Sequence, residues 1–507
     1  MSILQVKSLS HILYILVAAA FFALIGDTLF TQGMFMDGLI YSNVANNLAD
    51  GVGSFWHLSY TQTQFHEFYE HPPLAMGLCS LFYSVLGSGV WVGRLYSMFM
   101  TLISAFLIVR LWTTLGFERR TGWLPLLFWI LVPAVSLNSH ENMLECTMGV
   151  FVLLAVILML RGKWWRMVLA GLSLLAAFLS KGFTGLYPLA LPFVLFLFRD
   201  RDNAFTRSRA HGFQCALHDT SLVLVSLLAG FGLTCLLCRD AWPFLTTYFQ
   251  GQVFDGINSP TADSRLHIVV KFFEETAFLW IILVLNIAIQ LIWWYRRKRG
   301  GGGTDKAEQS HPNWLPAYRF ETVDDKVVFS NIRISLWLAA FTLCGVLPIM
   351  VSLKQRSFYI LTVYPFMACS VAVLMQRQAE RLCDTKSRPL KVAVASLCAA
   401  LCVVAVSVNV AHAGRPGRDD AMLNDMKQIA PLLEKGEVVS VSQNMSDEYS
   451  LQGYYYMERR ISLDPYHQQK HLLLDNEEDF TRLGFDSTYT EIPLNTTQYK
   501  LYKRYSD

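Results

Sequence analysis

The chain has 507 residues, of which 53% are hydrophobic and only 16% are charged, and its mean hydropathy is +0.35. A soluble globular protein of this length would carry more polar surface, so the composition excludes that class and indicates a polytopic membrane protein. The formal net charge of +3 excludes little, because the placement of charges matters more than their sum in a membrane protein. The ten cysteines have no metal-type spacing and indicate neither a disulfide framework nor a zinc site.

Apolar stretches of span length recur from the N-terminus to residue 411. The first, His11 to Phe30, follows Lys7 and lacks a convincing small-residue cleavage site, so we expect an uncleaved anchor. Stretches of roughly the 17 to 22 residues needed to cross a membrane follow near residues 92–112, 123–139, 143–160, 166–183, 184–198, 219–238, 276–295, 333–352, 358–375 and 392–411. The sequence therefore predicts an α-helical polytopic membrane protein with about 11 to 13 spans.

Basic residues are concentrated in alternate connections between these stretches. If the N-terminus is cytoplasmic, all strongly basic connections fall on the cytoplasmic side: those within residues 110–120, 161–166, 199–209, 296–299 and 377–391. This arrangement requires the apolar segment Pro73–Leu86 to lie along the membrane as an interfacial helix, since it is too short to cross. The extracytoplasmic side then receives the first outer loop, residues 31–91, and everything after residue 411.

The composition divides the chain into a membrane-embedded part, residues 1–411, and an extracytoplasmic α/β domain, residues 412–507. Residues 296–332, with four successive glycines, are typical of a flexible cytoplasmic linker. Within the C-terminal part, hydrophobic patterns predict helices near 419–434 and 447–458 and strands near 437–442, 461–463, 471–474 and 499–505.

The first outer loop carries two groups of polar residues. Asp37 opens a helix-like stretch, Gly38 to Leu48, with Tyr41 one turn further on. Asp37 fits a helix cap as well as a catalytic base, and these roles are not exclusive. In Tyr69-Glu70-His71-Pro72-Pro73, two prolines hold the preceding residues extended and aim their side chains at a fixed point. An ordinary solvated loop is the alternative for this second group.

Several short motifs follow one another along the chain and fall on one side of the membrane. They are Asp37 with Tyr41, Tyr69-Glu70-His71-Pro72-Pro73-Leu74, Arg94-Leu95, Leu144-Glu145, Lys181-Gly182, and Lys354-Gln355-Arg356-Ser357-Phe358-Tyr359 with Pro365. In order and placement they resemble the bacterial dolichyl-phosphate-mannose-protein mannosyltransferase-like family of the glycosyltransferase C superfamily, which includes the lipid A aminoarabinose transferase. The resemblance covers roughly residues 10–375.

The resemblance implies an inverting transferase of the bacterial inner membrane. Such an enzyme moves a sugar from a polyprenyl-phosphate donor to an acceptor hydroxyl on lipid A, a protein or a glycan. Membrane lipids are its other partners, and nucleic acid is not one. By the same resemblance Asp37 is the general base, and cations must steady the departing phosphate. The candidates for the phosphate are Lys181, Lys354, Arg356, Tyr359, His71 and Arg265, with Tyr41, Tyr69 and Glu70 shaping the site.

Each candidate cation also has a structural interpretation. Lys181 fits a lysine that snorkels to the membrane surface, and any short turn between spans can carry charges such as Lys354 and Arg356. Glu145 stands where the family usually has Asp, at the start of a span. An acid at that depth is costly unless it is paired, so we expect it to orient the acceptor or a lysine such as Lys181, or else to form a structural ion pair.

Two residues depart from the family pattern. Gly38 stands where a second acidic residue is common, which argues against a two-carboxylate or metal-bridged scheme. His71 stands where many members have Lys, so charge at this position requires a protonated imidazole. Glu70 and His71 are suitable ligands for a divalent metal, but two adjacent residues rarely make a full site. The sequence predicts no certain cofactor.

Two other classes of function share the general pattern of many spans with charged residues. A transporter or flippase of lipid-linked sugars would show internal repeats and charges near the membrane midplane, whereas no repeat is present here and the charges gather on one face. A non-catalytic assembly subunit would use the C-terminal domain as a docking surface. The transferase is the first prediction, and these two are its alternatives.

Overall fold

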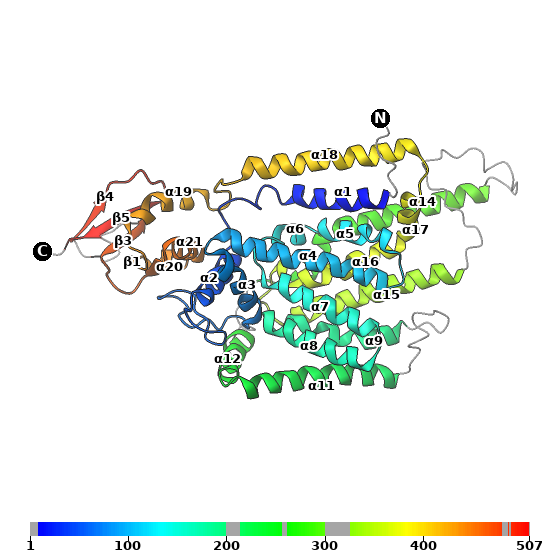
Figure 1. The fold of residues 1–507 in the computed structure, drawn as a ribbon, viewed down its shortest axis with the longest axis horizontal. Helices are drawn as coiled ribbons and strands as arrows, with labels where there is room; N and C mark the ends of the chain where they lie inside the picture. Colours follow the sequence, from blue (N-terminus) through cyan, green and yellow to red (C-terminus); the bar gives the residue numbers. More distant parts are fainter. Residues whose placement is uncertain are drawn as a thin grey trace.

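The computed structural model describes residues 9–198, 213–255, 261–299, 325–478, 485 and 488–505. The basic connection at 199–209 and most of the expected linker 296–332 lie outside these residues. The described chain is mostly helical, with a bundle of long helices and a small sheet at one end of it (Figure 1).

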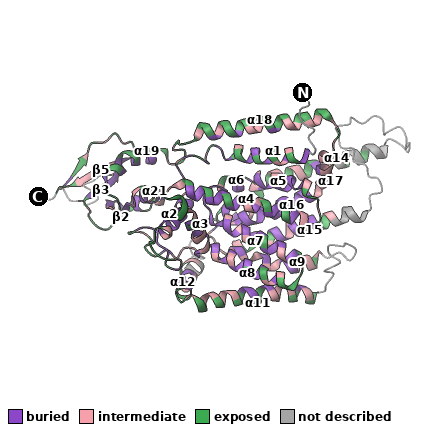
Figure 2. Cartoon of the chain, viewed as in Figure 1, coloured by how far each residue is buried: buried purple, intermediate pink, exposed green. Residues whose placement is uncertain are grey.

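The bundle is built from α1 (Leu9–Leu24), α4 (Val90–Thr114), α5 (Trp123–Ile130), α6 (Pro133–Asn138), α7 (Leu144–Leu160), α8 (Trp164–Lys181), η2 (Phe183–Ala190), α9 (Leu191–Leu197), α11 (Phe213–Leu237), α14 (Ala277–Arg299), α15 (Asp325–Val346), η5 (Leu347–Val351), η6 (Ser357–Val363), α16 (Tyr364–Leu374), α17 (Gln376–Cys383) and α18 (Arg388–His412). Buried residues concentrate in α4, α7 and α16, whereas few residues of α11 and α18 are buried (Figure 2). Exposed apolar side chains on α11 and α18 suit contact with lipid.

Among the described residues, five helices are long and apolar enough to cross a membrane: Val90–Thr114, Phe213–Leu237, Asn331–Val351, Ser357–Leu374 and Arg388–His412. Shorter apolar helices lie at most of the other predicted spans, including α1 and α7. The chain is thus an integral membrane protein, and the count of 11 to 13 spans stays a prediction.

Proline breaks two of the stretches that hydropathy alone predicted as continuous. Residues 123–139 form two helices, α5 and α6, because Pro133 starts the second and cannot donate to the first. Residues 184–198 begin as the 3₁₀ segment η2, which contains Pro188, before α9 starts.

The first outer loop contributes two helices at that end, α2 (Met36–Ala49) and α3 (Leu74–Leu86). Both were expected from the sequence, although the interfacial placement of α3 is not tested. At the same end of the bundle lies α12 (Ala241–Tyr248), which is followed by the π-helical segment η3 (Phe249–Asp255) (Figure 1). Helix α13 (His267–Glu275) follows and leads into α14.

The C-terminal unit combines helices α19 (Asp420–Ile429), α20 (Gln443–Ser446) and α21 (Tyr449–Arg459) with strands β1 (Val438–Val441), β2 (Ser462–Asp464), β3 (His471–Asp475), β4 (Tyr489–Ile492) and β5 (Tyr499–Arg504). The strand order is β2-β1-β3-β5-β4, in which β1 pairs in parallel with β2 and β3 while β5 runs antiparallel to β3 and β4. The sequence predicted the other strands but neither β4 nor α20.

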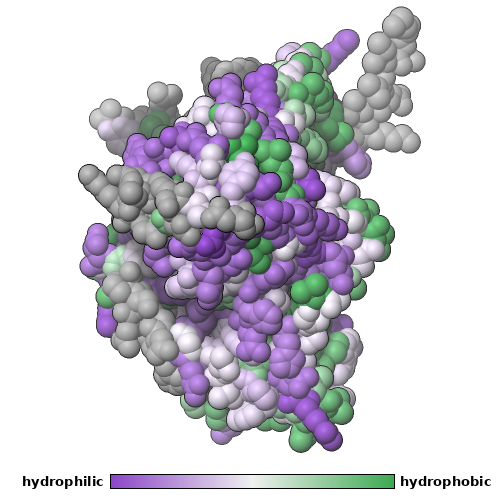
Figure 3. All heavy atoms as spheres, turned by 90° about the vertical axis from the view of Figure 1, so that its left-hand side faces the viewer, coloured by the Kyte–Doolittle hydropathy of each residue, from purple (hydrophilic) through white to green (hydrophobic). Residues whose placement is uncertain are grey.

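The core of this unit extends beyond residue 412. Met34 and Leu39 of the first outer loop are fully buried and pack into the same cluster as residues of α19, α21 and the sheet. The end of the molecule that bears the unit presents mainly hydrophilic side chains, with hydrophobic ones toward the rim (Figure 3). The C-terminal unit and the start of α2 therefore fold against each other.

Candidate active site

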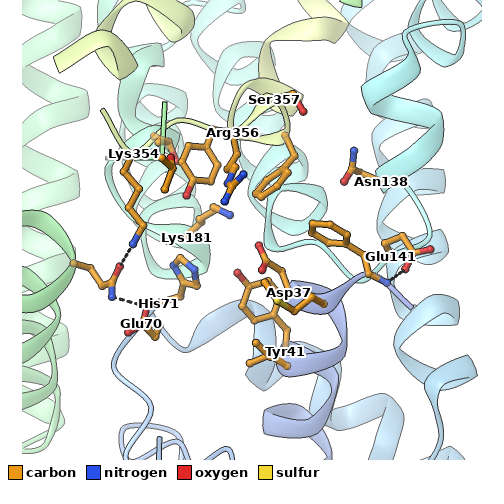
Figure 4. Close-up of a pocket in the computed structure, with 18 of the residues that line it drawn as sticks. Asp37, Tyr41, Glu70, His71, Asn138, Glu141, Lys181, Lys354, Arg356 and Ser357 are labelled. Carbon is orange, nitrogen blue, oxygen red and sulfur yellow. Dashed lines mark hydrogen bonds between the residues drawn. The ribbon is translucent and has the colours of Figure 1, made fainter. Parts of the chain in front are cut away.

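A cavity of about 1160 Å³ lies where the first outer loop, the turn before η6 and the C-terminal unit meet. Its polar lining includes Asp37, Tyr41, Glu70, His71, Asn138, Glu141, Lys181, Gln252, Lys354, Arg356, Tyr359, Arg418 and Tyr449. An apolar flank is formed by residues such as Leu137, Phe183 and Ile349. Most of the residues predicted for the site, from segments more than three hundred positions apart in the chain, thus share one cavity (Figure 4).

Asp37 is the second residue of α2, and Phe35 occupies the N-cap position without a side-chain cap. Asp37 therefore does not supply the cap. Its carboxylate points toward Lys181 and Arg356 (Figure 4). Burial raises the pKa of Asp37 above its ordinary range, while the charges of Lys181, Arg356 and Lys354 oppose that rise. The result is a carboxylate with increased basicity, held among cations.

Lys181 ends α8 and pairs with Glu145 in the first turn of α7, with 2.5 Å between Nζ and Oε1. Both side chains are almost fully buried. The ammonium also lies 5.3 Å and 5.0 Å from the ring centroids of Phe358 and Tyr359, within the range of cation–π attraction. Lys181 lines the cavity and Glu145 does not, so the acid lies behind the lysine with which it pairs.

Glu70 and Lys354 are joined through a residue that the sequence did not reveal. Gln252, in η3, donates from Nε2 to Glu70 Oε2 at 2.5 Å and accepts from Lys354 Nζ at 3.0 Å. Burial raises the pKa of Glu70, opposed by Lys354 and by the Gln252 hydrogen bond. An isolated glutamine in a long loop gives no chemical signal, so only the folded chain identifies Gln252.

His71 is partly buried and lines the cavity, and its ring contacts that of Tyr41 edge-on at 5.5 Å between centroids. Burial, reinforced by Lys181 and Lys354, places the pKa of His71 well below its ordinary value. The structure thus favours a neutral imidazole that acts as a hydrogen-bonding group. Tyr41 likewise stays protonated, because burial and nearby carboxylates raise its pKa.

Arg356 also lines the cavity but is exposed, and its guanidinium has no hydrogen bond or ion pair within the described part of the chain. Two predicted residues lie elsewhere. The Tyr69 hydroxyl bonds Glu67, and its ring packs on Phe244 of α12. The Arg265 side chain is exposed outside the cavity, and only its carbonyl takes part, as an acceptor for Gln355 Nε2 at 3.0 Å.

A metal ion would need more ligands than the predicted pair. Glu70 and His71 both line the cavity, but in the described ranges no group of three or more His, Cys, Asp or Glu side chains is arranged to hold a metal.

Comparison with known proteins bears on the family. Residues 70–228 match the family model described as dolichyl-phosphate-mannose-protein mannosyltransferase. The fold is similar to that of ArnT from Cupriavidus metallidurans bound to undecaprenyl phosphate, with a TM-score of 0.60 and 14% identity over 96% of this chain and 97% of that one. These findings show a similarity to that family over residues 70–228 and a fold shared with ArnT. The apo state of the same ArnT gives a TM-score of 0.57, with 14% identity over 96% of each chain. Among curated protein sequences, none matches the chain.

Gly38 stands where the sequence resemblance implies a second acidic residue, and the structure gives a geometric reason for the glycine. A Cβ on Gly38 would lie 1.7 Å from the backbone carbonyl oxygen of Glu141. No side chain fits there unless one segment moves. An acidic side chain next to Asp37 is therefore incompatible with the packing of this chain.

Proposed function

We propose that the protein transfers a sugar from a polyprenyl-phosphate donor to an acceptor hydroxyl, with inversion, on the extracytoplasmic face of a bacterial inner membrane. The observation that carries the proposal is the position of the Asp37 carboxylate, which shares one cavity with Lys181, Lys354 and Arg356. A base beside several cations fits a reaction in which one group loses a proton while another leaves as an anion.

In the proposed step the acceptor oxygen attacks the anomeric carbon from the face opposite the lipid phosphate. The bond from that carbon to the phosphate oxygen breaks, and the leaving phosphate keeps the electron pair. Asp37 takes the hydroxyl proton, and its raised pKa strengthens it as a base. Lys181, Lys354 and Arg356 stabilise the negative charge on the departing phosphate. The apolar flank of the cavity suits a prenyl chain.

Two supporting roles follow from the contacts of the first outer loop. Gln252 holds Glu70 and Lys354 together, which fixes the lysine against the cavity wall. Neutral His71 and protonated Tyr41 can donate or accept hydrogen bonds with the sugar or the phosphate without adding charge. The similarity to an ArnT crystallised with undecaprenyl phosphate supports this class of donor.

Transfer of radiolabelled sugar by the purified protein, reconstituted in lipid with undecaprenyl-phosphate-linked donors, tests the proposal. Asp37→Asn should lower the rate roughly 10²- to 10⁴-fold, the usual contribution of a general base, and leave binding of undecaprenyl phosphate intact. Asp27→Asn is the matched control, since Asp27 is exposed outside the cavity. A folded wild-type protein that transfers nothing from a broad donor set would favour the transporter or the assembly subunit instead.

A further inference from the structure

Glu141 is buried at the edge of the cavity, in the turn between α6 and α7, and the proposed chemistry does not use it. Its Oε2 accepts a hydrogen bond of 2.7 Å from the backbone N–H of Phe35, the residue that precedes α2. In Figure 4 Glu141 lies away from the cations around Asp37. The carboxylate therefore contacts the chain two residues before the proposed base.

A buried arginine completes this contact. Arg94 of α4 is 3.7 Å from Glu141 Oε1, and His140 Nε2 is 3.2 Å from the same oxygen. The Arg94 guanidinium also donates to the backbone carbonyls of Leu29, Thr31 and Gly33. Burial opposes ionisation of Glu141, but His140, Arg94 and the Phe35 N–H outweigh it and lower its pKa. Arg94 and Glu141 together hold the segment that leads into α2.

The turn that carries Glu141 also packs directly on α2. The backbone carbonyl oxygen of Glu141 fills the space beside Gly38, and Asn142 Nδ2 donates to Ser42 Oγ at 2.8 Å. Gly38 and Ser42 are one helical turn apart, so the turn follows one face of α2. Asn142 has a φ of +51°, a left-handed conformation that asparagine tolerates better than most residues.

The C-terminal unit holds the same segment from the other side. The hydroxyl of Tyr454 accepts from the N–H of Met34 at 2.8 Å and donates to Asp419 at 2.8 Å. The amides of Gln32 and Gly33 donate to the carbonyls of Arg415 and Pro416. The residues just before Asp37 thus have their backbone groups held one after another, which leaves the base little freedom to shift.

We infer that Glu141, supported by Arg94, is a positioning residue for the catalytic base: it holds the Phe35 amide so that the first turn of α2 directs Asp37 at the reacting hydroxyl. This inference rests on the proposed function for its kinetic consequences. A misplacement of about 1 Å can cost roughly 10²-fold in rate, so loss of Glu141 should lower kcat without weakening donor binding.

The chain offers a graded set of variants. Glu141→Ala removes the acceptor and should lower kcat roughly 10- to 100-fold, with the KM for the donor within about twofold of wild type. Glu141→Gln keeps an acceptor oxygen for the Phe35 N–H and should retain most of kcat. Gly38→Ala places a methyl group against the Glu141 carbonyl and should reproduce the kcat loss by displacing α2 instead.

Glu275 provides a matched control. Its Oε2 accepts from the backbone N–H of Ala134 at 2.7 Å, the same kind of bond at a helix start, but Glu275 is not part of the cavity. Glu275→Ala should lower the melting temperature and leave kcat unchanged. Glu141→Ala with kcat within twofold of wild type would overturn the inference, as would a Glu141→Gln variant as slow as Glu141→Ala.

Hydrogen exchange separates this inference from the proposed function. In Glu141→Ala, the amides of residues 29–40 should exchange faster than in wild type, whereas Glu275→Ala should leave them unchanged. Unaltered exchange in Glu141→Ala would contradict the inference that Glu141 holds this segment, whatever the activity of the variant. If the wild-type protein transfers no sugar but Glu141→Ala speeds exchange in this segment, the proposed function is wrong. The structural part of the inference, that Glu141 holds the segment before α2, is then still supported.

Discussion

Two buried acid–cation pairs flank the cavity, and they face it in opposite ways. In the pair Lys181–Glu145 the cation lines the cavity and the acid lies behind it. In the pair Arg94–Glu141 the acid lines the cavity and the cation lies behind, bonded to backbone carbonyls. The first pair presents positive charge to a ligand in the cavity. The second pair instead makes hydrogen bonds to backbone groups of the chain.

We propose that this difference reflects two different roles. Burying two charges costs several kcal/mol per ion, and a pair often stabilises a fold no better than apolar residues would. A pair whose cation faces a cavity has a further use, because a ligand anion can share that cation. A pair whose acid takes a backbone N–H instead fixes the position of nearby residues. The predictions below test this division of roles.

The largest effect is expected for Lys181→Met. It leaves Glu145 buried without its partner, which should cost about 3–5 kcal/mol of folding stability and remove binding of undecaprenyl phosphate. Adding Glu145→Leu should restore most of the stability, since an apolar pair often replaces a buried ion pair without loss. Thermal unfolding and lipid-phosphate binding measure the two effects. Recovery of binding in the double variant would show that the lysine does not serve the donor.

Arg356→Ala should produce the next largest effect. Loss of a hydrogen bond to a charged group costs about 1.5–3 kcal/mol, so the Kd for undecaprenyl phosphate should rise roughly 10- to 150-fold. The melting temperature should stay unchanged, because Arg356 is exposed and makes no polar contact within the described ranges. An unchanged Kd would assign the phosphate to Lys181 and Lys354 alone.

The sequence anticipated the cation side of this comparison better than the acid side. Lys181, Glu145 and the Lys354–Arg356 turn stand out because charges are rare and costly near membrane spans. Glu141 sits in a turn where a carboxylate needs no explanation, and its partners Arg94 and Phe35 lie about fifty and a hundred positions away. Such a contact depends on how α2, α4 and the α6–α7 turn pack, which no local pattern encodes.

The fold likewise has features that the sequence predicts and features that it does not. Apolar length located the helices at 90–114, 144–160 and 388–412, because burial in lipid requires such stretches. It did not reveal that Pro133 divides one stretch in two, or that Met34 and Leu39 complete the core of the C-terminal unit. The boundary at residue 412 marks where the composition changes, while packing joins the unit to the start of α2.

The pH dependence of the reaction gives a smaller effect with a definite sign. As the proposed base, Asp37 must be deprotonated, so the rate should fall as the pH drops through its pKa, which burial raises above the ordinary aspartate range. Lys354 is one of the charges that oppose that rise. Lys354→Met should therefore move the acid limb of the kcat/KM profile to higher pH. Arg265→Met is the control, because Arg265 is not among those charges. If the acid limb does not move in Lys354→Met, the residue whose pKa sets that limb is not Asp37.

The smallest effect is expected for Arg265→Ala, which tests a cation outside the cavity against the cations that line it. The resemblance to the family placed Arg265 among the phosphate ligands, but its side chain is exposed and does not line the cavity. Its hydrogen bond with Gln355 uses the backbone carbonyl of Arg265, which alanine retains. We expect a change in donor affinity within about 0.5 kcal/mol, typical of a surface substitution. An affinity loss as large as that of Arg356→Ala would mean that the outer loop closes over the donor and brings this guanidinium to the phosphate.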